Sequence, residues 1–107
     1  MNIMKEMGEA ACLEQLAEEA VELAQAALKM ARIRRGESPT ETSESEARGA
    51  LREEIADVLT CIDVIREGDM VPLKDIGDTC LRKRERWELR LRAAQSIKIN
   101  GKDVMPG

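Results

Sequence analysis

Helix-forming residues dominate this chain in three long stretches that glycine and proline barely interrupt. Ala, Leu, Glu and Arg are the residues that lose least on entering a helix, so each stretch favours one long α-helix. Two of the stretches carry apolar residues at steps of three and four, which is the spacing of one helix face. These stripes are Leu13, Leu16, Ala20, Leu23, Ala27 and Met30, then Leu51, Ile55, Val58, Leu59, Ile62 and Ile65. The sequence therefore predicts an all-α protein.

Turn-forming residues set the expected helix limits. The first helix is predicted from about Gly8 to Arg34, and residues 1–7 either extend it or form a separate short turn. Gly36 stops it, and a polar linker follows over residues 35–45, where Ser43 or Ser45 caps the next helix. That second helix is predicted over residues 44–67. The linker either folds over a ligand or simply connects the two helices.

A third helix is predicted from Pro72 to about Ala94, because proline suits the first turn of a helix. Gly77 weakens it, so a kink or a split is expected there. The segment 97–104 has apolar residues on either side of an Asn-Gly pair, a hairpin pattern, although a loosely docked tail is the preferred interpretation. We therefore expect one domain over residues 1–94 and a C-terminal tail over 95–107.

Composition narrows the classes of function. The chain has 107 residues, 17 Lys and Arg, 21 Asp and Glu, and no His, Phe or Tyr. The mildly acidic balance gives no support for binding polymeric nucleic acid, and no apolar run approaches the about 20 residues of a membrane span. Three cysteines without a CxxC pair are typical of buried thiols in a reducing compartment, so we expect a cytoplasmic protein.

Two short acidic motifs stand inside the first two predicted helices. They read Glu18-Glu19-Ala20-Val21-Glu22 and Glu53-Glu54-Ile55-Ala56-Asp57. Residues three apart share a helix face, so each motif offers two converging carboxylates. If the two faces pack together, four carboxylates meet, which is unfavourable unless a hard cation neutralises them. The pattern predicts a cation site, with Mg²⁺ as the expected ion.

The four carboxylates of this predicted site are Glu19, Glu22, Glu54 and Asp57. Asp57 has aliphatic neighbours on both sides, which predicts that it is buried with partners or faces a polar cavity. Lys29 lies two turns beyond Glu22 and is placed to reach an anionic ligand above the metal. The competing interpretation is a solvated acidic face with pairs inside each helix, and it is the preferred one for Glu18 and Glu53.

These motifs resemble the signature of the MazG-like all-α nucleoside triphosphate pyrophosphohydrolases, which is Glu-x-x-Glu on one helix and Glu-x-x-Asp on the next. The resemblance covers residues 12–91 and includes Leu23 after the first motif and Val58-Leu59 after the second. It also includes the basic stretch 83–87 on the last helix. The linker between the motifs is longer than is usual in the family, and the part before the first motif is shorter.

The resemblance implies a Mg²⁺-dependent enzyme that hydrolyses a nucleoside or deoxynucleoside triphosphate to the monophosphate and pyrophosphate, clearing the nucleotide pool. Its metal ligands and catalytic carboxylates would be Glu19, Glu22, Glu54 and Asp57. One of these, or the neighbouring Glu18 or Glu53, would orient or deprotonate the attacking water, and the sequence does not select which. Lys83 and Arg86 would hold the triphosphate together with Lys29, unless the last helix is merely a solvated basic one. Trp87 is more readily explained as a core residue than as a base-stacking platform.

The assembly follows from the same comparison. Family members with few helices per subunit complete their bundle by dimerising, and three amphipathic helices leave an apolar face to cover. We therefore expect a helical bundle with three main helices per chain and a four-helix-bundle-like core completed in a homodimer or a dimer of dimers. The alternative function is a non-catalytic helical dimerisation or interaction module. A di-metal carboxylate oxidase is disfavoured because histidine is absent.

Overall fold

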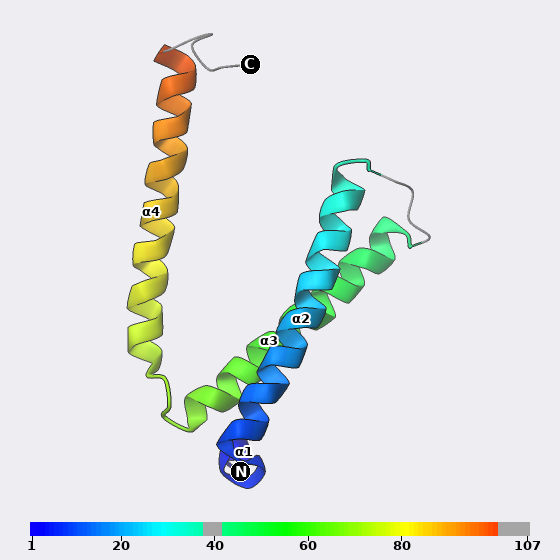
Figure 1. Cartoon of the computed structure of the whole chain (residues 1–107), viewed down its shortest axis with the longest axis vertical. Helices are drawn as coiled ribbons and strands as arrows, with labels where there is room; N and C mark the ends of the chain where they lie inside the picture. Colours follow the sequence, from blue (N-terminus) through cyan, green and yellow to red (C-terminus); the bar gives the residue numbers. More distant parts are fainter. Residues whose placement is uncertain (38–41, 101–107) are drawn as a thin grey trace. The chain divides into compact units, whose positions relative to one another are not determined.

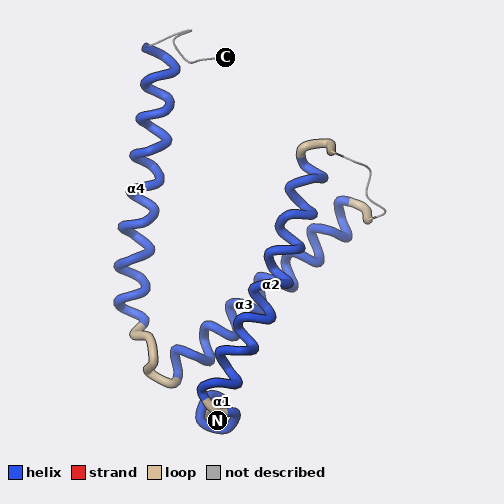
Figure 2. Tube along the Cα trace, viewed as in Figure 1, coloured by secondary structure: helices blue, strands red, loops and turns tan. Residues whose placement is uncertain are grey.

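The computed structural model describes residues 1–37 and 42–100, and within them every regular element is a helix (Figures 1 and 2). The helices are α1 (Ile3–Met7), α2 (Glu9–Arg34), α3 (Glu44–Glu67) and α4 (Leu73–Asn100). The predicted all-α class and its three main helices are confirmed, and residues 1–7 supply a separate short helix. Contacts divide the chain into two units that meet between Val71 and Pro72, and each is described by itself below.

The first unit is built on the α2–α3 pair, whose helices run in opposite directions (Figure 1). The less exposed residues of the two helices recur at alternating steps of four and three, the spacing at which one helix packs along another. We call these positions the seam. The seam comprises Cys12, Leu16, Glu19, Leu23, Ala26 and Met30 of α2, and Ala47, Leu51, Glu54, Val58, Cys61 and Ile65 of α3.

The predicted apolar stripes are partly wrong. Leu16, Leu23, Met30 and the α3 residues Leu51, Val58 and Ile65 do lie in the seam, whereas the other predicted members face away from it. The residues that remain exposed are Leu13, Ala20, Ala27, Ile55, Leu59 and Ile62. Each of them directly follows a seam residue, so its apolar character alone predicted a place in the core that the packing does not give it. The observed seam contains Cys12, Glu19 and Glu54 in their place, and two of these three residues are charged.

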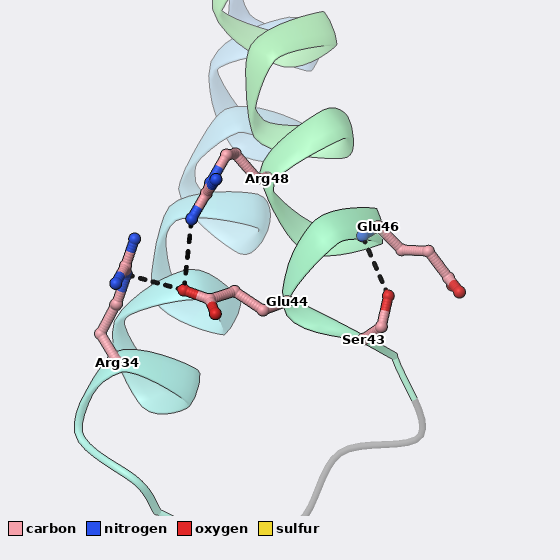
Figure 3. A network of polar contacts seen from close by, with 5 residues as sticks. All are labelled: Arg34, Ser43, Glu44, Glu46 and Arg48. Carbon is pink, nitrogen blue, oxygen red and sulfur yellow. Dashed lines mark hydrogen bonds and ion pairs between the residues drawn. The ribbon is translucent and has the colours of Figure 1, made fainter.

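Polar contacts hold the two helices where α2 ends and α3 begins (Figure 3). Ser43 is the N-cap of α3, as predicted, and its Oγ accepts a hydrogen bond from the Glu46 amide at 3.1 Å. The Glu44 carboxylate lies 3.1 Å from Arg34 Nε of α2 and 3.4 Å from Arg48 of its own helix. Gly36 follows α2 with φ of 68°, in the left-handed region that favours glycine. Pro39 lies outside the described residues.

At the other end of the pair, α1 covers a small core. Met4, Cys12 and Ile65 are buried there, with exposed fractions of only 4–6%. The Asn2 side chain donates to the Glu67 carbonyl at 3.5 Å, which ties α1 to the end of α3. A Cβ atom at Gly68 would overlap Met4 Sδ, so glycine permits the close approach of α1. This core is small for the length of α2 and α3.

The second unit contains α4, which starts directly after Pro72 as predicted and passes through Gly77 without a break. It ends at Asn100, six residues beyond the predicted end at Ala94. Residues 97–100 are therefore helical and do not form a hairpin strand, and the rest of the predicted tail lies outside the described residues. Trp87 is 66% exposed, contrary to the prediction that it is a core residue. Among the described helices, none is long and apolar enough to cross a bilayer.

Candidate metal centre on the α2–α3 pair

Three of the four predicted carboxylates come together midway along the seam. Glu19 and Glu22 of α2 and Glu54 of α3 each offer one oxygen, and these oxygens all lie within 4.8 Å of one another. Glu19 and Glu54 occupy seam positions, so helix packing directs both toward the space between α2 and α3. Glu22 lies one helical turn beyond Glu19 and adds a third carboxylate from the side. We call these three residues the acidic cluster.

Two oxygens of the acidic cluster are shielded from solvent without a compensating contact. Glu19 Oε2 and Glu54 Oε2 are inaccessible and have no hydrogen-bond partner among the described residues. The other Glu19 oxygen accepts a hydrogen bond from the Gln15 side chain at 2.9 Å. A shielded carboxylate oxygen without a donor is energetically unfavourable, so each such oxygen favours a bound cation or proton.

The pKa of Glu19 reflects this environment. Removal from solvent raises the pKa above its ordinary value of 4.5, and the negative charges of Glu22 and Asp57 raise it further. The hydrogen bond from Gln15 opposes the shift but does not cancel it. Whatever supplies positive charge to this site, a proton or a metal ion, relieves the same repulsion.

The spacing of the acidic cluster is compatible with magnesium. Mg²⁺ binds oxygen at about 2.0–2.1 Å in octahedral geometry, which places neighbouring ligand atoms about 3 Å apart and opposite ones about 4.2 Å apart. The oxygens of the acidic cluster lie within 4.8 Å of one another. Each oxygen would therefore need to move by well under an ångström to reach these ligand distances. Small side-chain rotations would suffice, because carboxylate groups rotate easily about their last torsions.

Asp57 does not belong to the acidic cluster, and of its two predicted environments burial is wrong. Its neighbours Ile55 and Leu59 are themselves exposed, so aliphatic neighbours do not bury it. Asp57 is exposed too, although its charge is near enough to raise the Glu19 pKa. It therefore stands at the margin of the cluster, where a change of rotamer would decide whether it reaches a shared cation.

The residues beside the seam divide into two opposite faces. One residue step turns a helix by about 100°, and in antiparallel helices the same step turns toward the same side of the pair. Residues that precede seam positions form what we call the acidic face: Gln15, Glu18, Glu22 and Lys29 of α2 with Glu53, Asp57 and Thr60 of α3. Apolar residues that follow seam positions form the apolar face: Leu13, Ala17, Ala20, Ala24 and Ala27 of α2 with Ile55, Leu59 and Ile62 of α3. Three arginines of α3 that also follow seam positions, Arg48, Arg52 and Arg66, lie beyond its two ends.

A cavity of about 210 Å³ adjoins the acidic cluster toward α1. Its lining comprises Ile3, Met7, Cys12, Gln15, Thr60, Cys61 and Val64. Gln15 connects the two features, since it lines the cavity and donates to Glu19. Sequence analysis missed Gln15, although its position one turn before Glu19 was a usable signal.

The predicted phosphate-binding residues lie in both units. Lys29 is half-buried on α2, two turns beyond Glu22 and thus about 10 Å further along the helix. Lys83 and Arg86 are exposed on α4 and belong to the second unit. On α4, the ion pairs within the helix involve Arg84 and Arg92, which both contact Glu88 at 3.2 and 3.6 Å. The solvated-helix interpretation thus accounts for those two arginines.

Comparisons of the chain with protein-family models, with curated proteins and with solved structures find no match. The fold and the candidate site define a helical protein with an acidic cluster between two antiparallel helices.

Proposed function

We propose that this protein is a Mg²⁺-dependent nucleoside triphosphate pyrophosphohydrolase, similar in its motifs to the MazG-like enzymes. The observation that supports the proposal most is the acidic cluster, with its two shielded oxygens that lack a hydrogen-bond partner. Oxygen-only ligands and tight spacing suit a hard divalent cation, and histidine-based alternatives are absent from the sequence.

In this proposal Glu19, Glu22 and Glu54 hold the metal, and Asp57 joins them after a change of rotamer. Magnesium would offset the charge of the triphosphate and the charge that develops on the leaving pyrophosphate. A carboxylate of this group would orient the water that attacks the α-phosphorus atom. Lys29 is on the same face as Glu22 and would bind phosphate oxygens, with Lys83 and Arg86 as further candidates.

The cavity beside the cluster would take the nucleobase. Cavities near 150 Å³ hold a benzene ring, so about 210 Å³ accommodates one planar ring system and not a whole nucleotide. Aliphatic and sulfur-containing side chains such as Ile3, Met7 and Val64 line this cavity in a chain whose sole aromatic residue is Trp87. The amide of Gln15 supplies a polar group at the boundary between base and metal.

We also propose that the chain works as a homodimer or a dimer of dimers through the apolar face. Ile55, Leu59 and Ile62 are 42%, 59% and 39% exposed on α3, and the neighbouring positions of α2 are mainly alanine. Alanine allows helices to approach closely, so a second α2–α3 pair would complete a four-helix core. The acidic face lies opposite and stays open to substrate.

The alternative is a non-catalytic dimerisation module, which the exposed apolar face alone would support. The two functions differ in their response to ligand. A protein that binds Mg²⁺ and nucleotide only when folded melts at a higher temperature in their presence, whereas an interaction module without this site does not.

The decisive experiment offers the protein a panel of NTPs and dNTPs with Mg²⁺ and scores pyrophosphate and monophosphate. Glu54→Gln removes a cluster carboxylate at nearly constant volume and should lower pyrophosphate release about 100-fold or more. Glu53→Gln is the matched control, because Glu53 is the adjacent, exposed residue on the same helix. Circular dichroism should show both variants folded.

Equal rates for Glu54→Gln and the parent would disprove the proposed site. Release of orthophosphate in place of pyrophosphate would leave the site standing and change the reaction. No hydrolysis and no rise in melting temperature with any nucleotide would favour the interaction module.

A further inference from the structure

Two thiols form a layer of the seam that holds none of the proposed metal ligands. Glu19 and Glu54 face each other, with oxygens within 4.8 Å. Cys12 lies seven residues before Glu19, and Cys61 lies seven residues after Glu54. In an antiparallel pair these steps run in the same direction and cover the same distance, about 10 Å along each helix. Cys12 and Cys61 therefore occupy the equivalent facing layer, near α1.

Two further observations also indicate that the two thiols lie close together. Both cysteines line the same cavity of about 210 Å³. Burial raises the pKa of Cys61 most, followed by the charges of Glu19 and Asp57, and the charge of Cys12 raises it further. A thiol exerts that influence only from nearby. Cys80 is exposed on α4, in the other unit.

Helix geometry allows these two residues to be bridged. Packed helices lie about 8–10 Å apart, and each Cα atom is about 2.3 Å from its axis. Facing Cα atoms are then about 3.5–5.5 Å apart, which overlaps the range of about 4.4–6.8 Å found in disulfides. Small residues at a layer favour the shorter helix separations, so no large backbone movement is required.

We propose that Cys12 and Cys61 are an oxidisable dithiol that a small-molecule disulfide, such as oxidised glutathione, converts into a disulfide between α2 and α3. Both cysteines are free in this structure, which is the reduced form. The oxidation itself uses neither the metal ligands nor a nucleotide, although both thiols line the cavity proposed for the nucleobase.

The reaction takes place in two exchange steps. Cys61 is half-buried and Cys12 is buried, so Cys61 meets the oxidant first. Its thiolate attacks one sulfur of the small disulfide, forms a mixed disulfide and releases one thiolate. The Cys12 thiolate then attacks the Cys61 sulfur, closes the protein disulfide and releases the second thiolate. The two protons lost by the cysteines end on the two released thiols.

The bond would join the α1 end of the two helices, opposite the end where Ser43 and Glu44 hold them. It would close a loop of about fifty residues, and a loop of that size strongly restricts the unfolded chain. We expect the melting temperature of the oxidised protein to rise by on the order of 10 °C. Dithiothreitol should reverse the rise.

The test uses the full chain with Cys80→Ser, so that only the proposed pair remains. After treatment with oxidised glutathione, we expect both thiols to disappear, the mass to fall by two hydrogens, and a non-reduced digest to join the Cys12 and Cys61 peptides. Cys12→Ser in the same background is the matched control. It should stop at the mixed disulfide, with glutathione retained on Cys61.

Three results would overturn the proposal. The first is that glutathione stays on Cys61 while Cys12 remains a free thiol, because the two sulfurs then do not meet. The second is that disulfides join separate chains, which a non-reducing gel would show. The third is that neither thiol reacts under conditions that fully oxidise the urea-unfolded chain.

Discussion

The acidic and apolar faces of the α2–α3 pair are built from the same two helices and differ by a shift of two positions along each. Glu22 precedes the seam residue Leu23, and Ala24 follows it. On α3, Asp57 and Leu59 flank Val58 in the same way. Because each step turns the helix by about 100°, such neighbours point to opposite sides of the pair. A single seam therefore separates an acidic surface from an apolar one that is exposed to water.

Both faces are incompletely satisfied in the isolated chain, but in different ways. The acidic face concentrates negative charge beside the acidic cluster, in which two shielded carboxylate oxygens have no donor. The apolar face leaves large aliphatic side chains in water. A small positive ion relieves the first problem, whereas only an extended protein surface relieves the second. Under the proposed function, ligand binding and association would take place on opposite sides of one helix pair.

The largest expected effect comes from charging the apolar face. Leu59→Glu combined with Ile62→Glu should weaken self-association about a thousandfold or more, since a two-fold interface would bury four added carboxylates. Sedimentation at a series of concentrations measures the change. Gln25→Glu, an exposed change beside the seam on the acidic side, is the control and should leave the association unchanged. If the parent is monomeric at all concentrations, the apolar face has a different occupant.

The next effect compares two isoleucines of α3 that are three residues apart. Ile65 is 6% exposed in the core, whereas Ile62 is 39% exposed on the apolar face. Ile65→Ala should lower the free energy of unfolding by about 2–4 kcal/mol at every protein concentration. Ile62→Ala should matter little in dilute protein and more as the concentration rises, because it acts through association. Urea titrations at two concentrations separate these outcomes, and identical behaviour of both variants would contradict the assignment of faces.

The sequence predicted the helices well because their limits depend on local chemistry. Ser43 caps α3 and Pro72 precedes α4 where expected, and α2 and α3 have the predicted lengths. The exception is the end of α4, where Asn100 and the following glycine were interpreted as a turn. In that segment helix propensity in Ala93–Lys98 outweighed the hairpin pattern.

The faces were harder to predict because a charged residue can occupy a seam position. Assigning every apolar residue to the core placed Ile55 and Ile62 inside and made Asp57 look buried. The structure instead puts Glu19 and Glu54 in the 4–3 repeat and leaves Ile55 outside. Only packing, which depends on both helices together, distinguishes two adjacent stripes that are both rich in apolar residues.

The smallest expected effect is a change of melting temperature when Glu19 of the acidic cluster is replaced, and it depends on pH. Folding raises the pKa of Glu19, so the folded protein binds this proton more tightly than the unfolded chain does. Stability from this group is therefore greatest below the unfolded value near 4.5 and is lost as the pH rises through the folded pKa. Glu19→Gln removes the charge and should raise the melting temperature slightly at pH 7, with no gain below pH 4. Glu18→Gln, at the adjacent exposed position, should not reproduce this pattern.

Added Mg²⁺ should stabilise the parent at pH 7 and stabilise Glu19→Gln less, because the ion and the lost charge relieve the same repulsion. An equal response of both proteins to Mg²⁺ would remove Glu19 from the proposed ligands while leaving its pKa shift unaffected.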